Sequence, residues 1–256
     1  MKKVLLYFLI LLPVISFSQI TSGELTYRVS YLEEKDKQGI EQFNSKNPGL
    51  IPKERLEQAL KDVLEANKSL AYIDYVLEFN KNEAYFQVKQ NFMSIGSEIG
   101  KENFINFYVG VSGEYYHNIE KNISIHSWYH LDRQWLIEDE LYDFKWKLLP
   151  ETKIIQGYTC YKAIHKTKRP IQTYDEVIAW YAPGIPFSFG PAEYEGLPGL
   201  ILELEQGVYR FSAENIKFSE KPKKIKIPTK GEKHNREDFD KKQEQIMNRL
   251  KGQARK

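Results

Sequence analysis

Residues 71–88 read AYIDYVLEFNKNEAYFQV, and this stretch decides the class of the fold. Apolar and polar side chains alternate along 71–79 and along 84–88, which is the period of a β-strand with one buried face. Between the two segments, Asn80-Lys81-Asn82 supplies residue types that favour a tight turn. The stretch therefore predicts an antiparallel hairpin.

Segments of the same kind occur along most of the chain, separated by turn residues at intervals of roughly 8–12 residues. They lie at 24–32, 104–109, 114–117, 123–129, 133–137, 144–148, 160–166, 176–181, 200–205 and 208–218. In one of them, Phe144, Trp146 and Leu148 alternate and are predicted to share a face. We expect a mainly β protein with a strongly curved antiparallel sheet, in the form of a half-barrel or open barrel.

Two helices are expected to interrupt the strands. Pro52 suits a first helical position, and the apolar residues from Leu56 to Leu64 follow at helical spacing. A helix at 52–67, within an insert, should therefore pack against the sheet. A second helix is predicted at about 237–251, with Asn235 as its N-cap.

Charge is distributed unevenly along the chain. The 256 residues include 37 Lys+Arg and 35 Asp+Glu, yet residues 221–256 hold 13 basic and 5 acidic side chains. This basic C-terminal extension is compatible with contact to an anionic surface. The alternative is that it folds back on the acidic body at 19–220.

The N-terminus has the pattern of a secretory signal peptide. Lys2 and Lys3 precede an apolar run from Val4 to Ile15, and small residues at Ser16 and Ser18 fit a cleavage site before Gln19. The apolar run is shorter than the ~20 residues that cross a bilayer. We therefore expect a signal peptide at 1–18, export to the periplasm or the cell exterior, and no transmembrane segment. Export argues against a nucleic-acid partner.

The loop within Val177–Ile201 is the densest signal for a site. Its two Pro-Gly steps, Pro183-Gly184 and Pro198-Gly199, predict type II turns with positive φ at glycine. The aromatic residues between them either plug one end of the sheet or form the rim of a ligand site. The candidate binding residues are Trp180, Phe187, Phe189, Tyr194 and Leu197, and the structural turn residues are Pro183, Gly184, Gly196, Pro198 and Gly199.

Residues 196–201, Gly-Leu-Pro-Gly-Leu-Ile, carry a resemblance to a known family. The chain resembles the GLPGLI family of Bacteroidota envelope proteins, named after this hexapeptide. The segments 152–163 and 179–191 look like two further conserved blocks of that family. The resemblance implies secretion but no particular activity. A weaker similarity, to half-barrel envelope proteins that carry lipids or lipoproteins, suggests that a helix closes the sheet.

No catalytic motif is present in the sequence, so we assign no catalytic residue and no cofactor. Glu193 and Glu195 would share a face on a strand, which keeps an acid–base pair conceivable. His117 and His126 are weak metal candidates, because a hairpin centred on 121–122 would make them cross-strand neighbours. Cys160 is the single cysteine and is best interpreted as a small buried residue.

These features favour a non-catalytic envelope protein. It would bind a hydrophobic small molecule or an envelope protein through the Pro/Gly loop and the concave side of the sheet. The alternative is a secreted hydrolase or metal-binding protein whose site is assembled only in three dimensions.

Overall fold

The computed structural model describes residues 20–47, 49, 52–90, 109–130, 133–167, 176–242 and 245. The predicted signal peptide therefore lies outside the described residues, as does most of the strand expected at 104–109. In the part of the chain that is described, no helix is long and apolar enough to cross a bilayer.

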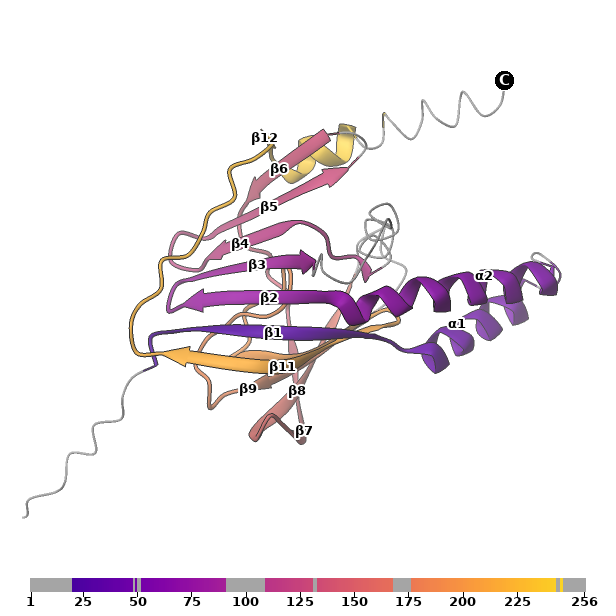
Figure 1. The fold of residues 1–256 in the computed structure, drawn as a ribbon, viewed down its shortest axis with the longest axis horizontal. Coiled ribbons are helices and arrows are strands. Elements are labelled where there is room, and N and C mark those ends of the chain that lie inside the picture. Colours follow the sequence, from indigo (N-terminus) through magenta and orange to yellow (C-terminus); the bar gives the residue numbers. More distant parts are fainter. Residues whose placement is uncertain are drawn as a thin grey trace, which may run out of the picture.

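The described strands form one open, curved sheet of 12 strands, so the predicted mainly β class is confirmed (Figure 1). Their order across the sheet is β12-β6-β5-β4-β3-β2-β1-β11-β10-β9-β8-β7. Neighbours pair antiparallel except β12 with β6, which are parallel. The strands are β1 (Ser22–Tyr31), β2 (Ile73–Asn80), β3 (Glu83–Gln90), β4 (Glu114–Asn118), β5 (Ile123–His130), β6 (Arg133–Asp139), β7 (Lys147–Ile155), β8 (Tyr158–Lys166), β9 (Glu176–Ala182), β10 (Leu200–Gln206), β11 (Tyr209–Ser219) and β12 (Glu232–His234).

The hairpin at 71–88 forms as predicted. Strands β2 and β3 pair with Phe79 opposite Ala84, and the side chain of Asn80 accepts hydrogen bonds from the backbone N–H groups of Asn82 and Glu83. At the turn, the side-chain oxygen of Asn80 takes the place of the backbone carbonyl acceptors that paired strands supply elsewhere. It thereby fixes the register of the two strands.

One face of the sheet, which we call the core face, carries the main hydrophobic core. Tyr27, Tyr75 and Phe86 on three adjacent strands are at most 1% exposed there. The loop from Pro183 to Gly199 packs onto the same face, where the rings of Phe79 and Phe187 lie 4.7 Å apart. The hydroxyl of Tyr27 donates to the carbonyl of Ile201 over 2.5 Å. The core face is thus covered by the Pro/Gly loop.

The two long helices between β1 and β2 do not cover the sheet, whereas the short helix that follows them buries Leu70 in the core. The long helices are α1 (Glu33–Lys46) and α2 (Lys53–Asn67), and the short one is the 3₁₀ helix η1 (Lys68–Tyr72). Figure 1 shows α1 and α2 extending beyond the strand ends, and no described side chain of either is buried. A helix is present where the sequence predicted one, but its predicted packing against the sheet is not seen. Its apolar stripe is only half-buried, and the half-barrel comparison stays a prediction.

The basic extension folds back on the body over its described part. Residues 221–231, which we call the strap, run from the end of β11 to β12, and Ile225 is buried with Tyr85 and Leu136 on the outer face of the sheet (Figure 1). Lys223 lies 3.2 Å from Glu78, and Lys226 pairs with Glu114. Of the two predictions for the extension, folding back is therefore what these residues do.

Beyond β12, residues 236–242 are helical, and the side chain of Asn235 accepts a hydrogen bond from the backbone N–H of Asp238. The predicted cap is therefore in place. The ring of Phe239 packs edge-on against Trp128 and Trp135, which face each other across β5 and β6.

Two substitutions in the strap test whether it packs on the sheet. We expect Ile225→Ala to lower the free energy of unfolding by about 2 kcal/mol, because a buried side chain leaves a cavity. The matched change Ile227→Ala, at a side chain that is 47% exposed, should cost less than about 0.5 kcal/mol. Urea unfolding measures both. Equal, small losses would mean that the strap does not pack on the sheet in solution.

Candidate functional site

The candidate binding residues of the Pro/Gly loop are core residues. Phe187, Phe189, Tyr194 and Leu197 are at most 4% exposed and belong to the main hydrophobic cluster. Trp180 lies in β9, and its ring carries the ammonium group of Lys153 at 4.3 Å from the ring centroid. This placement favours the plug interpretation of the loop, because most of these side chains are already surrounded by protein.

The two Pro-Gly steps differ from the prediction of two type II turns. The N–H of Ile185 donates to Ala182 across Pro183-Gly184, but Gly184 does not have positive φ, so that prediction was wrong there. A turn with both central residues at negative φ needs no glycine. Gly196 and Gly199 do have positive φ, at 84° and 155°. A type II turn has a φ of about 80° at its glycine, and the N–H of Leu200 donates to Ile185 and not to Leu197, so the type II turn predicted at Pro198-Gly199 is not formed either. A Cβ on Gly199 would lie 2.3 Å from the carbonyl oxygen of Ala182.

This contrast gives a matched pair of variants. We expect Gly199→Ala to cost on the order of 2 kcal/mol of stability, because the backbone must move and the φ is unfavourable for alanine. Gly184→Ala meets nothing within 4 Å and should change stability by less than about 0.5 kcal/mol. Thermal unfolding of the two variants decides whether the last glycine of the signature is required by the fold. A tolerated Gly199→Ala would leave that glycine without a structural role.

A cavity of about 250 Å³ lies on the outside of this loop. One wall is the turn at Gly196-Leu197-Pro198, and the other is the segment 142–148 that precedes and enters β7. Its lining comprises Tyr142, Asp143, Phe144, Lys145, Trp146, Leu148, Glu195, Gly196, Leu197 and Pro198. The indole N–H of Trp146 donates to the carbonyl of Glu195 over 2.8 Å and so joins the two walls.

Glu195 is the more deeply buried of the two carboxyl groups in this lining. It is 4% exposed, and its Oε2 atom lies 3.5 Å from Nδ1 of His117 on β4. Burial raises the pKa of Glu195 to about 8 and lowers the pKa of His117 to about 4. Near neutral pH both side chains are therefore uncharged, and the pair is an acid beside a neutral imidazole rather than an ion pair.

The predicted cross-strand contact of His117 with His126 was wrong in register. His117 faces Ser124, and His126 faces Tyr115, because the loop between β4 and β5 is longer than the two-residue turn assumed. His126 stacks between Tyr115 and Trp128 at ring distances of 3.9 and 4.1 Å. Removal from water lowers the pKa of His126 to about 3. Among the described residues, no three His, Cys, Asp or Glu side chains are grouped closely enough to hold a metal ion.

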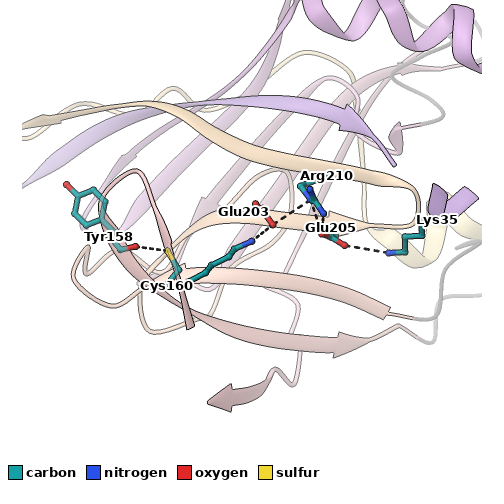
Figure 2. A network of polar contacts seen from close by, with 7 residues as sticks. Lys35, Tyr158, Cys160, Glu203, Glu205 and Arg210 are labelled. Atoms are coloured by element: carbon teal, nitrogen blue, oxygen red, sulfur yellow. Dashed lines mark hydrogen bonds and ion pairs between the residues drawn. The ribbon is translucent and has the colours of Figure 1, made fainter. Parts of the chain in front are cut away.

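A polar network centred on β10 and β11 includes none of the residues that line the cavity (Figure 2). Glu203 accepts a hydrogen bond from Lys153 over 2.6 Å, and Glu205 accepts from Arg210 over 2.7 Å, with Lys35 at 3.8 Å. Cys160 is buried nearby, and burial raises the pKa of its thiol to about 11. The thiol is thus kept protonated, which fits its interpretation as a small core residue.

Comparison with known proteins tests the family resemblance. The family model described as "Protein of unknown function (Porph_ging)" matches residues 165–203, which include the signature. This match confirms the resemblance to the GLPGLI family. The family is a GLPGLI-type family of Bacteroidota proteins of unknown function. The match therefore indicates neither a reaction nor a ligand for the cavity.

Five chains of solved structures also match. Two of them, titled as structures of PNGF-II in space groups C2 and P21, have TM-scores of 0.49 and 0.48 and 13% sequence identity. The match covers 86% of this chain and 32% of the PNGF-II chain, so this chain spans about a third of that length. The likeness is distant. No curated protein sequence matches.

Two features of the site were missed by sequence reasoning. The cavity joins segments that are fifty residues apart, and the alternation of Phe144, Trp146 and Leu148 gave the only sequence signal for one of its walls. Glu195 and His117 were each singled out from the sequence with other partners, Glu193 and His126, but no local pattern pairs them with each other. The predicted residue Leu197 does line the cavity.

Proposed function

We propose that this chain is a non-catalytic, exported envelope protein that binds a ligand in the cavity between the signature turn and the segment 142–148. The cavity itself carries the proposal. It holds exposed aromatic and aliphatic groups, Tyr142 at 44% and Leu148 at 52% exposure, beside a few polar side chains. Recesses in which apolar side chains stand beside polar groups that orient the ligand are where proteins bind small molecules.

The buried loop aromatics serve this site as scaffold. Phe187 and Phe189 hold the loop on the core face, which positions Leu197 and the turn at Gly196 and Pro198 as one wall. Replacing the phenylalanines would therefore damage the fold before it tested binding. Variants at the cavity rim separate the two effects, because exposed side chains there contribute little to stability.

The experiment is native against denaturing mass spectrometry on protein purified from its own envelope. We expect a stoichiometric adduct that is lost on denaturation. Leu148→Arg, inside the cavity, should abolish the adduct. Ile154→Arg, on the same strand, 66% exposed and outside the cavity, should keep it. A bare polypeptide mass for the parent, or an adduct that survives Leu148→Arg, would contradict the proposal.

A second candidate function has one specific observation in its favour. Glu195 and His117 meet at 3.5 Å, and a carboxyl group with a pKa near 8 has the protonation state of a general acid. This favours a secreted hydrolase in which Glu195 donates a proton to a leaving group in the cavity. Activity on a panel of esters, peptides and glycans that disappears in Glu195→Gln would support it. Absence of turnover across the panel would exclude those three substrate classes.

A further inference from the structure

We infer that one end of the sheet docks on a lipid bilayer with anionic headgroups. This end, which we call the basic rim, is built from the start of β1, the β2–β3 and β4–β5 turns, and the end of β11 with the beginning of the strap. Its residues are 20–22, 80–83, 118–122 and 219–224. The inference goes beyond the proposed function and does not depend on the cavity. Two observations carry it: exposed lysines that have no ion-pair partner, and exposed isoleucines among them.

Hydrogen bonds hold the segments of the basic rim together. The backbone N–H of Ile119 donates to the carbonyl of Asn82 over 2.9 Å, which joins the two turns. The side chain of Asn80 donates to the carbonyl of Lys223 over 3.0 Å, which joins the first turn to the strap. The start of β1 pairs with the ends of β2 and β11. The rim is therefore one surface at one end of the sheet, and α1 and α2 lie at the opposite end (Figure 1).

Four lysines of the rim remain available to a partner although the strap folds back. They are exposed, and in the part of the chain that is described no carboxylate lies within ion-pair distance of their ammonium groups. These lysines are Lys81, Lys121, Lys221 and Lys224. By contrast, Lys223 pairs with both Glu24 and Glu78. The folding back of the strap thus neutralises only part of its positive charge.

Fewer acidic side chains are exposed at the rim. Glu83 is half-buried and accepts a hydrogen bond from the hydroxyl of Tyr116 over 2.6 Å. Glu120 and Glu220 are exposed, and Glu120 accepts a hydrogen bond from the amide of Asn82 over 2.7 Å. Four exposed lysines therefore stand against two exposed carboxylates, and this excess of positive charge attracts anionic headgroups.

Two exposed isoleucines lie among these lysines and distinguish a bilayer from other anionic partners. Ile20, just before β1, is 39% exposed, and Ile119, in the β4–β5 turn close to Lys121, is 41% exposed. At a bilayer surface, aliphatic side chains enter the boundary between headgroups and acyl chains while lysines reach the phosphates. A soluble polyanion offers no apolar layer for the isoleucines. The combination therefore favours a bilayer over an acidic polysaccharide.

The test uses protein purified from its own envelope and measures its co-sedimentation with vesicles of phosphatidylglycerol or phosphatidylcholine. We expect retention on phosphatidylglycerol at low salt, loss of retention at high salt, and at least about tenfold weaker retention on phosphatidylcholine. Lys221→Glu with Lys224→Glu should weaken retention at least about tenfold, and so should Lys81→Glu with Lys121→Glu. Ile119→Ser should weaken it about threefold. The matched control, Lys46→Glu with Lys61→Glu in α1 and α2, changes the net charge equally at the opposite end and should keep retention within about twofold.

The outcomes separate the rim from overall charge and from the cavity. No retention of the parent on phosphatidylglycerol, or equal retention on both lipids, would overturn the inference. Equal losses in the rim variants and in the control would also overturn it, because net charge alone would then explain binding. Full retention of Ile119→Ser, together with equally tight binding of dextran sulfate, would assign the rim to a soluble polyanion instead. The adduct in native mass spectrometry should be the same in the parent and in every rim variant, so failure here leaves the proposed function standing.

Discussion

Glu195→Gln should make the protein more stable than the parent at alkaline pH, and the gain should grow with pH. The folded state keeps the Glu195 proton up to a pKa of about 8, whereas the unfolded chain releases it near the ordinary value of 4.5. Between these values the native state binds more protons than the unfolded state, so stability falls as pH rises. The slope from one such group is about 1.4 kcal/mol per pH unit. Glutamine has no proton to lose and removes that slope.

Unfolding in urea at about pH 5.5 and about pH 7.5 measures the effect. The difference in unfolding free energy between Glu195→Gln and the parent should increase by about 3 kcal/mol over that interval. The pKa of His117 is lowered to about 4, so it costs stability only as pH falls below about 6.5, and it does so in both proteins. Glu237→Gln is the control, because Lys241 holds the pKa of this exposed carboxyl below its ordinary value. Parallel curves for Glu195→Gln and the parent would contradict a buried, protonated Glu195.

Phe189→Ala should destabilise the protein by about 3–5 kcal/mol, the ordinary cost of removing a buried aromatic side chain. Phe189 is 0% exposed, its strand-like bridge to Glu195 closes the loop, and its carbonyl accepts a hydrogen bond from Ile201. Its loss therefore leaves a cavity under the whole Pro/Gly loop.

The matched control is Tyr129→Ala, whose side chain is 63% exposed and which should lose less than about 0.5 kcal/mol. Chemical unfolding followed by far-UV circular dichroism measures both variants. A loss below about 1 kcal/mol at Phe189 would show that the loop is not part of the core. In that case the alternative interpretation, an aromatic rim open to ligand, would be favoured.

The hairpin at 71–88 and the positions of most described strands along the chain could be predicted because period-2 alternation and turn residues are local signals. Helix α1 could not, because Glu33–Lys46 has few apolar residues to mark a buried stripe. The register of β4 with β5 was misplaced by two positions, and period-2 alternation is unchanged by such a shift. Local sequence patterns thus predicted most of the strands but not how neighbouring strands align with each other.

The candidate site depended on contacts that no local pattern encodes. The aromatics of the signature loop were identified, but their burial depends on the core face supplied by β1, β2 and β3, which lie far from the loop in the sequence. The cavity needs two segments to meet, and the shifted pKa of Glu195 needs the surrounding core. Composition did predict the charge imbalance, and the structure shows that ion pairs such as Lys223 with Glu78 balance part of it internally.

The most direct test of the central claim, that the cavity beside the signature turn is the ligand site, is to follow the four tryptophan indole signals by two-dimensional ¹H–¹⁵N NMR. A solvent extract of the native envelope is added to the full chain, and Trp146→Phe assigns the signal of Trp146. The account predicts that the Trp146 signal shifts, because its N–H bonds to Glu195 in the cavity wall, while the signals of Trp128 and Trp135 stay in place. Shifts at Trp128 and Trp135 with an unchanged Trp146 would place the ligand elsewhere and contradict the account.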